Sequence, residues 1–264
     1  MRARVPFALI AALALIGICT ASATADPAAP PGTPTAKPFD GTSRVGPLFP
    51  SGTSARHGCT AAVLASTTRD LIVTAAHCVD GTAAGIQFAP GYDRGATPYG
   101  VWTVTRAYVD PAWITSHDPT RDFAILRVAK KRSNHRPTGV EDVTGGAVLG
   151  AAPGDGTSIT DVAYNSGIDD QPISCTTAAH QTSAGPSFDC HGYVGGSSGS
   201  PWLSGDPDAD GTAVLGVIGG QNHGGCFEYT SYSSRFDAAV FTLLQRAEQG
   251  AAPDVVPAPG DNGC

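Results

Sequence analysis

Short apolar runs, separated by glycine, proline and other turn residues, dominate the hydrophobic pattern of this chain. Each run has the length of a β-strand and is rich in valine, isoleucine and threonine. The clearest runs are CTAAVLAS (59–66), LIVTAAHCV (71–79), GVWTVTRAYV (100–109), FAILRVA (123–129), SITDVAY (158–164) and TAVLGVIGG (212–220). Such strands, recurring without long helical patterns between them, predict an all-β protein built from barrels or a sandwich.

One late segment has a helical pattern instead. Its apolar residues recur at helical spacing, so they would share one face: Phe236, Val240, Leu243, Leu244 and Ala247. The preceding Ser-Arg-Phe-Asp of residues 234–237 resembles a capping box, which predicts that the helix begins at Ser234.

The two ends of the chain have different compositions from the rest. Residues 1–25 combine Arg2 and Arg4 with an apolar stretch and an Ala-Thr-Ala cleavage site, which predicts a signal peptide and a secreted protein. Residues 26–44 are rich in proline, alanine and threonine, which is typical of a linker or pro-segment. Residues 251–264 look like a similarly loose tail, although Cys264 could anchor it.

Charge and cysteine content narrow the function classes. A net charge of −7 argues against a nucleic-acid partner and against binding to an anionic membrane. Without Cys19 in the leader, six cysteines remain, and an even number in an exported chain predicts three disulfides with fifteen possible pairings. No two cysteines have zinc-site spacing, so we expect neither a metal nor a cofactor.

Three short segments carry candidate chemistry. His77 follows a strongly apolar strand, Asp122 stands at the head of another, and Ser197 and Ser198 lie together in GGSSGSP. A nucleophilic serine needs a base to take its proton, and the base needs a carboxylate to fix its tautomer. The order His, Asp, Ser is the order found in chymotrypsin-type proteases.

The local sequences strengthen this interpretation. TAAHC, DFAIL and GSSGSP resemble the three catalytic segments of the trypsin/chymotrypsin superfamily, and GSSGSP is similar to its secreted bacterial branch related to glutamyl endopeptidases. The resemblance implies two packed antiparallel β-barrels, at residues 45–140 and 141–250, with a C-terminal α-helix. It also implies a monomeric serine endopeptidase that hydrolyses polypeptides through an acyl-enzyme, with His77, Asp122 and Ser198 as the triad.

The register of the serine segment separates the two serines. Matched to the family's segment, Ser198 is the nucleophile, and the N–H groups of Gly196 and Ser198 form the oxyanion hole. GGSSG also matches the nucleophile elbow of esterases, which would select Ser197 but requires a strand–elbow–helix context and a different triad order. A third hypothesis is an inactive protease homologue that binds protein ligands.

Position 197 departs from the family's pattern. Zymogen-activated members have an aspartate there, which pairs with the amino terminus that cleavage frees, and a serine cannot form that ion pair. Arg44-Val45-Gly46 nevertheless resembles a processing site, so removal of a pro-segment stays open.

The resemblance also implies disulfides and a specificity pocket. Cys59 and Cys78 flank the histidine segment as in the family's histidine loop, Cys175 and Cys190 bracket a loop before the nucleophile, and Cys226 and Cys264 remain. The expected pocket residues are Gly192, Gly219, Gly220 and Gln221. Position 192, at the pocket base, holds no carboxylate, and Ile218 stands where glutamyl members place a histidine. We therefore expect a preference for apolar or medium-sized side chains.

One further motif resembles half of a calcium loop. Asp206, Asp208 and Asp210 precede Gly211, but the twelfth position of such a loop is Val217 rather than a bidentate glutamate. We therefore expect a hairpin turn at residues 206–211 rather than a calcium site.

Overall fold

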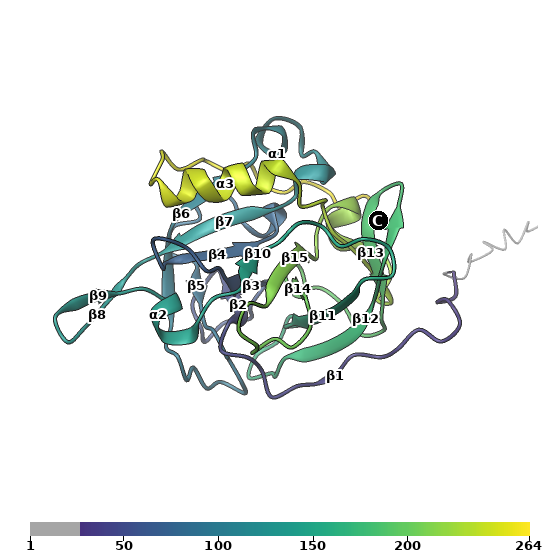
Figure 1. The fold of residues 1–264 in the computed structure, drawn as a ribbon, viewed down its shortest axis with the longest axis horizontal. Helices are drawn as coiled ribbons and strands as arrows, with labels where there is room; N and C mark the ends of the chain where they lie inside the picture. Colours follow the sequence, from purple (N-terminus) through teal and green to yellow (C-terminus); the bar gives the residue numbers. More distant parts are fainter. Residues whose placement is uncertain (1–26) are drawn as a thin grey trace, which may run out of the picture.

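The computed structural model describes residues 27–264, and the predicted signal peptide lies outside them. Two β-sheets account for most of the architecture, and one long helix near the C-terminus packs against the first sheet (Figure 1). Within residues 27–264, none of the helices has both the length and the apolar character needed to cross a bilayer.

The first half of the chain forms a closed antiparallel barrel. Its strands, in the order in which they pair, are β2 (Val45–Phe49), β3 (Cys59–Val63), β4 (Leu71–Thr74), β7 (Ala124–Val128), β6 (Trp102–Val109) and β5 (Gln87–Phe88). Neighbouring residues face different cores: Leu48 and Ile72 belong to one apolar cluster, and Phe49 and Val73 to another. Burial of both faces explains why these runs are apolar throughout instead of alternating.

The second half forms an eight-stranded sheet. Along its path lie β10 (Val148–Leu149), β15 (Ala213–Val217), β14 (Pro201–Leu203), β11 (Ser158–Ala163), β12 (Ile173–Thr182), β13 (Gly185–Asp189) and β16 (Thr230–Tyr232). The path is open at β10 and β16, and the β10–β15 pair is parallel whereas the other pairs are antiparallel. The predicted fold class is confirmed: the described chain is mostly β, with a closed antiparallel barrel and a C-terminal helix.

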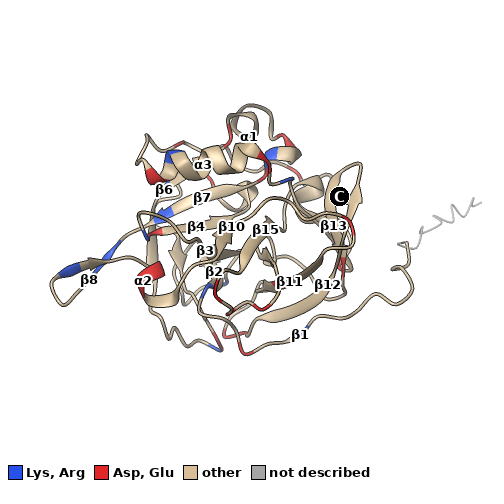
Figure 2. Cartoon of the chain, viewed as in Figure 1, with Lys and Arg blue, Asp and Glu red and all other residues tan. Residues whose placement is uncertain are grey.

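Short helices and a hairpin connect the strands. They are η1 (Ala76–Cys78), α1 (Pro111–Ser116), η2 (Pro119–Arg121), α2 (Glu141–Thr144), η3 (Gln221–Gly224) and the pair β8 (Lys131–Ser133) and β9 (Arg136–Thr138). Figure 2 shows basic residues on the β8–β9 hairpin and acidic residues distributed over both halves.

The C-terminal helix α3 (Ala238–Glu248) begins later than the sequence suggested. Asp237 is its N-cap and accepts a hydrogen bond from the backbone N–H of Ala239 at 2.8 Å. The predicted start at Ser234 is wrong because that hydroxyl serves a tertiary contact, accepting from the N–H of Asp122 and donating to the carbonyl of Pro119.

Both ends that looked loose pack against the domain. Near the N-terminus, β1 (Lys37–Pro38) pairs with β12, and the N–H of Ala36 donates to the carbonyl of His191 at 2.9 Å. In the C-terminal tail, Val256 is 2% exposed and pairs with Gly81.

The disulfides and the calcium-like loop were both the subject of expectations from sequence. All three disulfides have the expected partners: Cys59–Cys78, Cys175–Cys190 and Cys226–Cys264.

In the calcium-like loop, residues 206–211, the guanidinium of Arg44 donates to the carbonyls of Pro207 and Ala209 at 3.2 and 2.7 Å. A cationic side chain of the protein itself thus binds these oxygens, in the connection between β14 and β15.

Candidate active site

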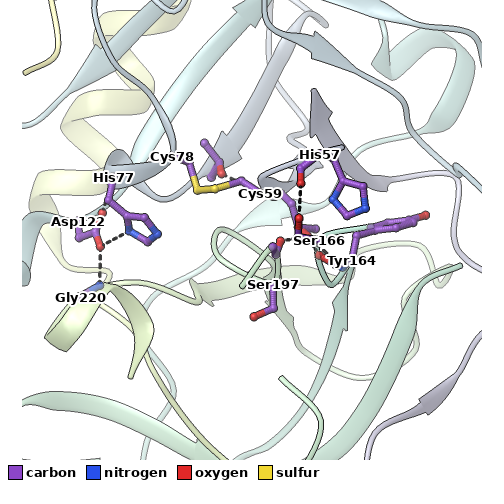
Figure 3. The surroundings of a disulfide bond; sticks show 12 residues. His57, Cys59, His77, Cys78, Asp122, Tyr164, Ser166, Ser197 and Gly220 are labelled. Atoms are coloured by element: carbon purple, nitrogen blue, oxygen red, sulfur yellow. Dashed lines mark hydrogen bonds and ion pairs between the residues drawn. A yellow bond between two sulfur atoms is a disulfide. The ribbon is translucent and has the colours of Figure 1, made fainter. Parts of the chain in front are cut away.

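Strand pairing brings His77 and Asp122 together. Thr74 at the end of β4 pairs with Ala124 at the start of β7, so residues just after β4 and just before β7 lie side by side. Asp122 is fully buried, and its Oδ2 accepts a hydrogen bond from Nδ1 of His77 at 2.7 Å. The same carboxylate accepts the backbone N–H groups of His77 at 2.9 Å and Gly220 at 2.8 Å (Figure 3).

These contacts keep Asp122 ionised. Burial by itself raises the pKa of this carboxyl, but the charge of His77 and the hydrogen bonds from His77 and Gly220 outweigh it and lower the pKa. A carboxylate beside Nδ1 holds the proton on that nitrogen and leaves Nε2 free to act as a base.

The loop that carries Ser198 is held by the first barrel. Thr60 of β3 donates its N–H to the carbonyl of Ser198 at 2.8 Å and its hydroxyl to the carbonyl of Gly196 at 3.0 Å. Ser198 and His77 line one cavity of about 490 Å³. No hydrogen bond joins Ser198 Oγ to His77 among the residues that the structure describes.

Backbone donors next to Ser198 are unoccupied. Gly196 has φ of +103°, and a Cβ there would collide with the backbone of Asn165 and Ser166, so the position requires glycine. Within residues 27–264, the N–H groups of Gly196 and Ser198 have no hydrogen-bond partner. Two free donors beside a serine hydroxyl are what an oxyanion hole needs.

Ser197 has a different environment. It is 5% exposed, and its hydroxyl donates to the carbonyl of Val194 at 2.8 Å. Strand β14, not a helix, follows this loop, so Ser197 does not have the strand–elbow–helix context of an esterase nucleophile.

A buried acid that sequence reasoning missed lies behind the loop. Asp161 of β11 is fully buried, and the hydroxyl of Ser200 lies 3.0 and 2.9 Å from its two oxygens. Burial raises the pKa of Asp161 well above its usual value, because the charged form is disfavoured where water is excluded. The sequence did not mark Asp161 as a buried acid, because SITDVAY has the pattern of an ordinary strand.

The wall of the cavity differs from the expected pocket. Segments 193–195 and 222–228 line it, together with Ile218. Of the predicted pocket residues, Gly220 and Gln221 line a neighbouring cavity of about 320 Å³, and Gly192 and Gly219 line neither. The 222–228 segment begins with a left-handed turn, in which Asn222 and His223 have φ of 52° and 53°.

Two side chains on this wall were not assigned from sequence. The ring of His223 stacks on that of His77, with centroids 4.6 Å apart and planes 9° apart. Glu228 accepts the N–H of Gly192 at 2.5 Å and bonds Nδ1 of His191 at 2.6 Å. Burial acts to raise the pKa of Glu228, but these two contacts outweigh it and lower the pKa. The cavity wall therefore has a carboxylate, although position 192 has none.

One cluster in the described chain has metal-ligand atoms close together, namely Cys59, His77 and Cys78. Both sulfurs belong to a disulfide, so neither can act as a thiolate ligand. The cluster therefore does not fit a metal site.

Known proteins resemble this chain in sequence and in fold. A model of the trypsin-like peptidase domain matches residues 59–217. The protease Anisep from Arthrobacter nicotinovorans superposes with a TM-score of 0.67 and 20% identity, covering 81% of this chain and all of that one. The thermostable serine protease AL20, from an extremophilic microorganism, has a TM-score of 0.65 and 23% identity over 79% of this chain and 98% of its own.

A curated relative shares only a segment. The extracellular metalloprotease of Bacillus subtilis (strain 168) is 32% identical over 98 residues, which is 36% of this chain. The aligned part spans 30% of the length of that relative. A Glu endopeptidase structure superposes with a TM-score of 0.61 and 17% identity, covering 83% of this chain and 98% of that one.

Proposed function

Because the chain belongs to the family of trypsin-like peptidase domains, we propose that it is a secreted serine endopeptidase that cuts polypeptides through an acyl-enzyme. The observation that carries the proposal is the buried contact of Asp122 with His77, whose ring lines the same cavity as Ser198. The three disulfides and the predicted signal peptide support secretion, because disulfides persist in oxidising compartments.

Each residue has a defined role in this mechanism. Ser198 Oγ attacks the substrate carbonyl while Nε2 of His77 accepts its proton, and Asp122 stabilises the imidazolium. The N–H groups of Gly196 and Ser198 stabilise the oxyanion. His77 then gives its proton to the leaving amine, and water hydrolyses the acyl-enzyme. In the described structure, Ser198 and His77 do not share a hydrogen bond. The order of steps above is compatible with that, because catalytic hydrogen bonds often shorten only when substrate binds.

Covalent labelling tests the proposal directly. A fluorophosphonate probe should modify Ser198, as peptide mass mapping would show, and Ser198→Ala should abolish both labelling and peptide hydrolysis. Ser197→Ala is the matched control and should keep substantial activity, because its hydroxyl bonds a backbone carbonyl. Labelling at Ser197 would support the esterase hypothesis instead.

A folded wild-type protein without labelling or hydrolysis would support the inactive, ligand-binding homologue. The preference for apolar or medium-sized side chains remains a prediction, which cleavage of a peptide library would test.

A further inference from the structure

The stacking of His223 on His77 occupies one face of the proposed base. The rings are nearly parallel at 4.6 Å, which leaves no space between them for a substrate side chain. Burial and the neighbouring His77 lower the pKa of His223, so the stacked ring is neutral at neutral pH. A neutral ring beside His77 also avoids repulsion when His77 becomes an imidazolium.

The loop that carries His223 has an unfavourable conformation. Asn222 and His223 are consecutive residues with side chains, and both have left-handed backbone angles. Such angles are rare outside glycine and persist only where surrounding contacts hold them. Within the loop, the N–H of His223 donates to the carbonyl of Gly220 at 3.0 Å and that of Gly225 to the carbonyl of Asn222 at 3.3 Å. Contacts from outside the loop add to these two bonds.

The C-terminal strap, residues 254–264, supplies those contacts. The side-chain amide of Asn222 donates to the carbonyl of Asn262 at 2.8 Å, and Cys264 is bonded to Cys226 just beyond the loop. Farther back, the strap is fixed to the first barrel, where Val256 pairs with Gly81. The strap thus connects the first barrel with the wall of the Ser198 cavity.

The same elements limit the space around the nucleophile. Asn262 and His223 line the cavity of Ser198, and both also line the adjacent cavity, together with Trp113 and residues 259–261. A substrate residue whose carbonyl meets Ser198 extends its side chain into the first cavity. On the proposed mechanism, the residue before it lies against the wall that the two cavities share, where His223 covers one face of His77.

We propose that His223, held by the C-terminal strap, is a specificity-determining residue that admits only a small side chain on the substrate residue preceding the attacked carbonyl. This inference rests on the proposed endopeptidase function. It identifies the substrate class as polypeptides with glycine or alanine at that position. Bulky residues there would have to displace the stacked ring and the strap contacts that hold it.

Acetyl-Xaa-Yaa-p-nitroanilides test the proposal, with Yaa fixed as the residue that the wild-type enzyme prefers. Wild type should cleave the substrate with Xaa as glycine better than the one with leucine. In His223→Gly, the ratio of kcat/KM for leucine over glycine should rise about tenfold or more, a change of the size that pocket contacts produce. His180→Ala, on an exposed position of β12, is the matched control and should leave the ratio unchanged.

A second variant tests the strap. Cys226→Ser combined with Cys264→Ser keeps His223 but releases the end of the strap, and it should shift the ratio in the same direction. Peptides varied after the scissile bond should show no such shift in either variant. An unchanged Xaa ratio in an active His223→Gly enzyme would overturn the proposal, and so would equal loss of activity on both substrates, because His223 would then only position His77. A wild-type protein without labelling at Ser198 would instead refute the proposed function itself.

Discussion

Replacing Asp122 with asparagine changes one oxygen of a carboxylate into an NH₂ group at a fully buried position. The carboxylate accepts three N–H groups: Nδ1 and the backbone N–H of His77, and the backbone N–H of Gly220. Asparagine has only one acceptor oxygen, so it cannot satisfy all three donors. One orientation leaves the backbone N–H of His77 facing an NH₂ group, and the other presents that group to Nδ1 and Gly220.

The second orientation satisfies Nδ1 only when the proton moves to Nε2, and a protonated Nε2 cannot accept the proton of Ser198. The wrong tautomer is expected to lower kcat by about 10⁴, which corresponds to about 5.5 kcal/mol on the barrier. At least one buried donor also loses its partner, which should cost about 1–3 kcal/mol of stability.

The assay is kcat at pH 7.5 on a good peptide substrate, with thermal unfolding to show that the variant is folded. Asp110→Asn is the matched control, because Asp110 caps helix α1 and asparagine is an equally good N-cap. Turnover of a folded Asp122→Asn enzyme within tenfold of wild type would refute the assignment of Asp122 to the triad.

Three further predictions follow from other parts of the site. Burial raises the pKa of Asp161 well above its unfolded value, so its contribution to stability is complete below about pH 4 and is lost as the pH rises toward the folded-state pKa. The melting temperature of Asp161→Asn relative to wild type should therefore increase from pH 4 to pH 8, and a pH-independent difference would contradict this. Gly199 has φ of +80°, and a Cβ there would collide with the first barrel, so Gly199→Ala should lose most activity and melt lower. Gly205→Ala shares the positive φ without the collision, and equal effects of the two would exclude packing as the cause. A chain beginning at Asp26 should hydrolyse peptides with its Arg44–Val45 bond intact, because Val45 is fully buried in β2, and mass spectrometry after the assay checks this. Activity that appears only after cleavage at this bond would reveal an N-terminal switch.

The local sequence was sufficient to predict the main strands and to identify the proposed catalytic residues. The runs at 59–66 and 71–79 became β3 and β4 because both faces of these strands are buried, and continuous apolar runs encode such burial directly. His77, Asp122 and Ser198 lie in short motifs, so their identification needed no knowledge of distant contacts. Once two strands pair in register, the position of His77 beside Asp122 follows.

The tertiary structure alone decided the shape of the cavity and the role of the chain ends. The left-handed turn at Asn222 and His223 is bonded to Asn262 and lies beside the Cys226–Cys264 disulfide, and these partners lie about 40 residues away in sequence. The buried acid Asp161 likewise bonds Ser200, which lies in the loop before β14 and is 39 residues away in sequence. Propensity and hydrophobic periodicity report the conformation that a segment favours by itself, whereas these features are stabilised by contacts between segments that are far apart along the chain.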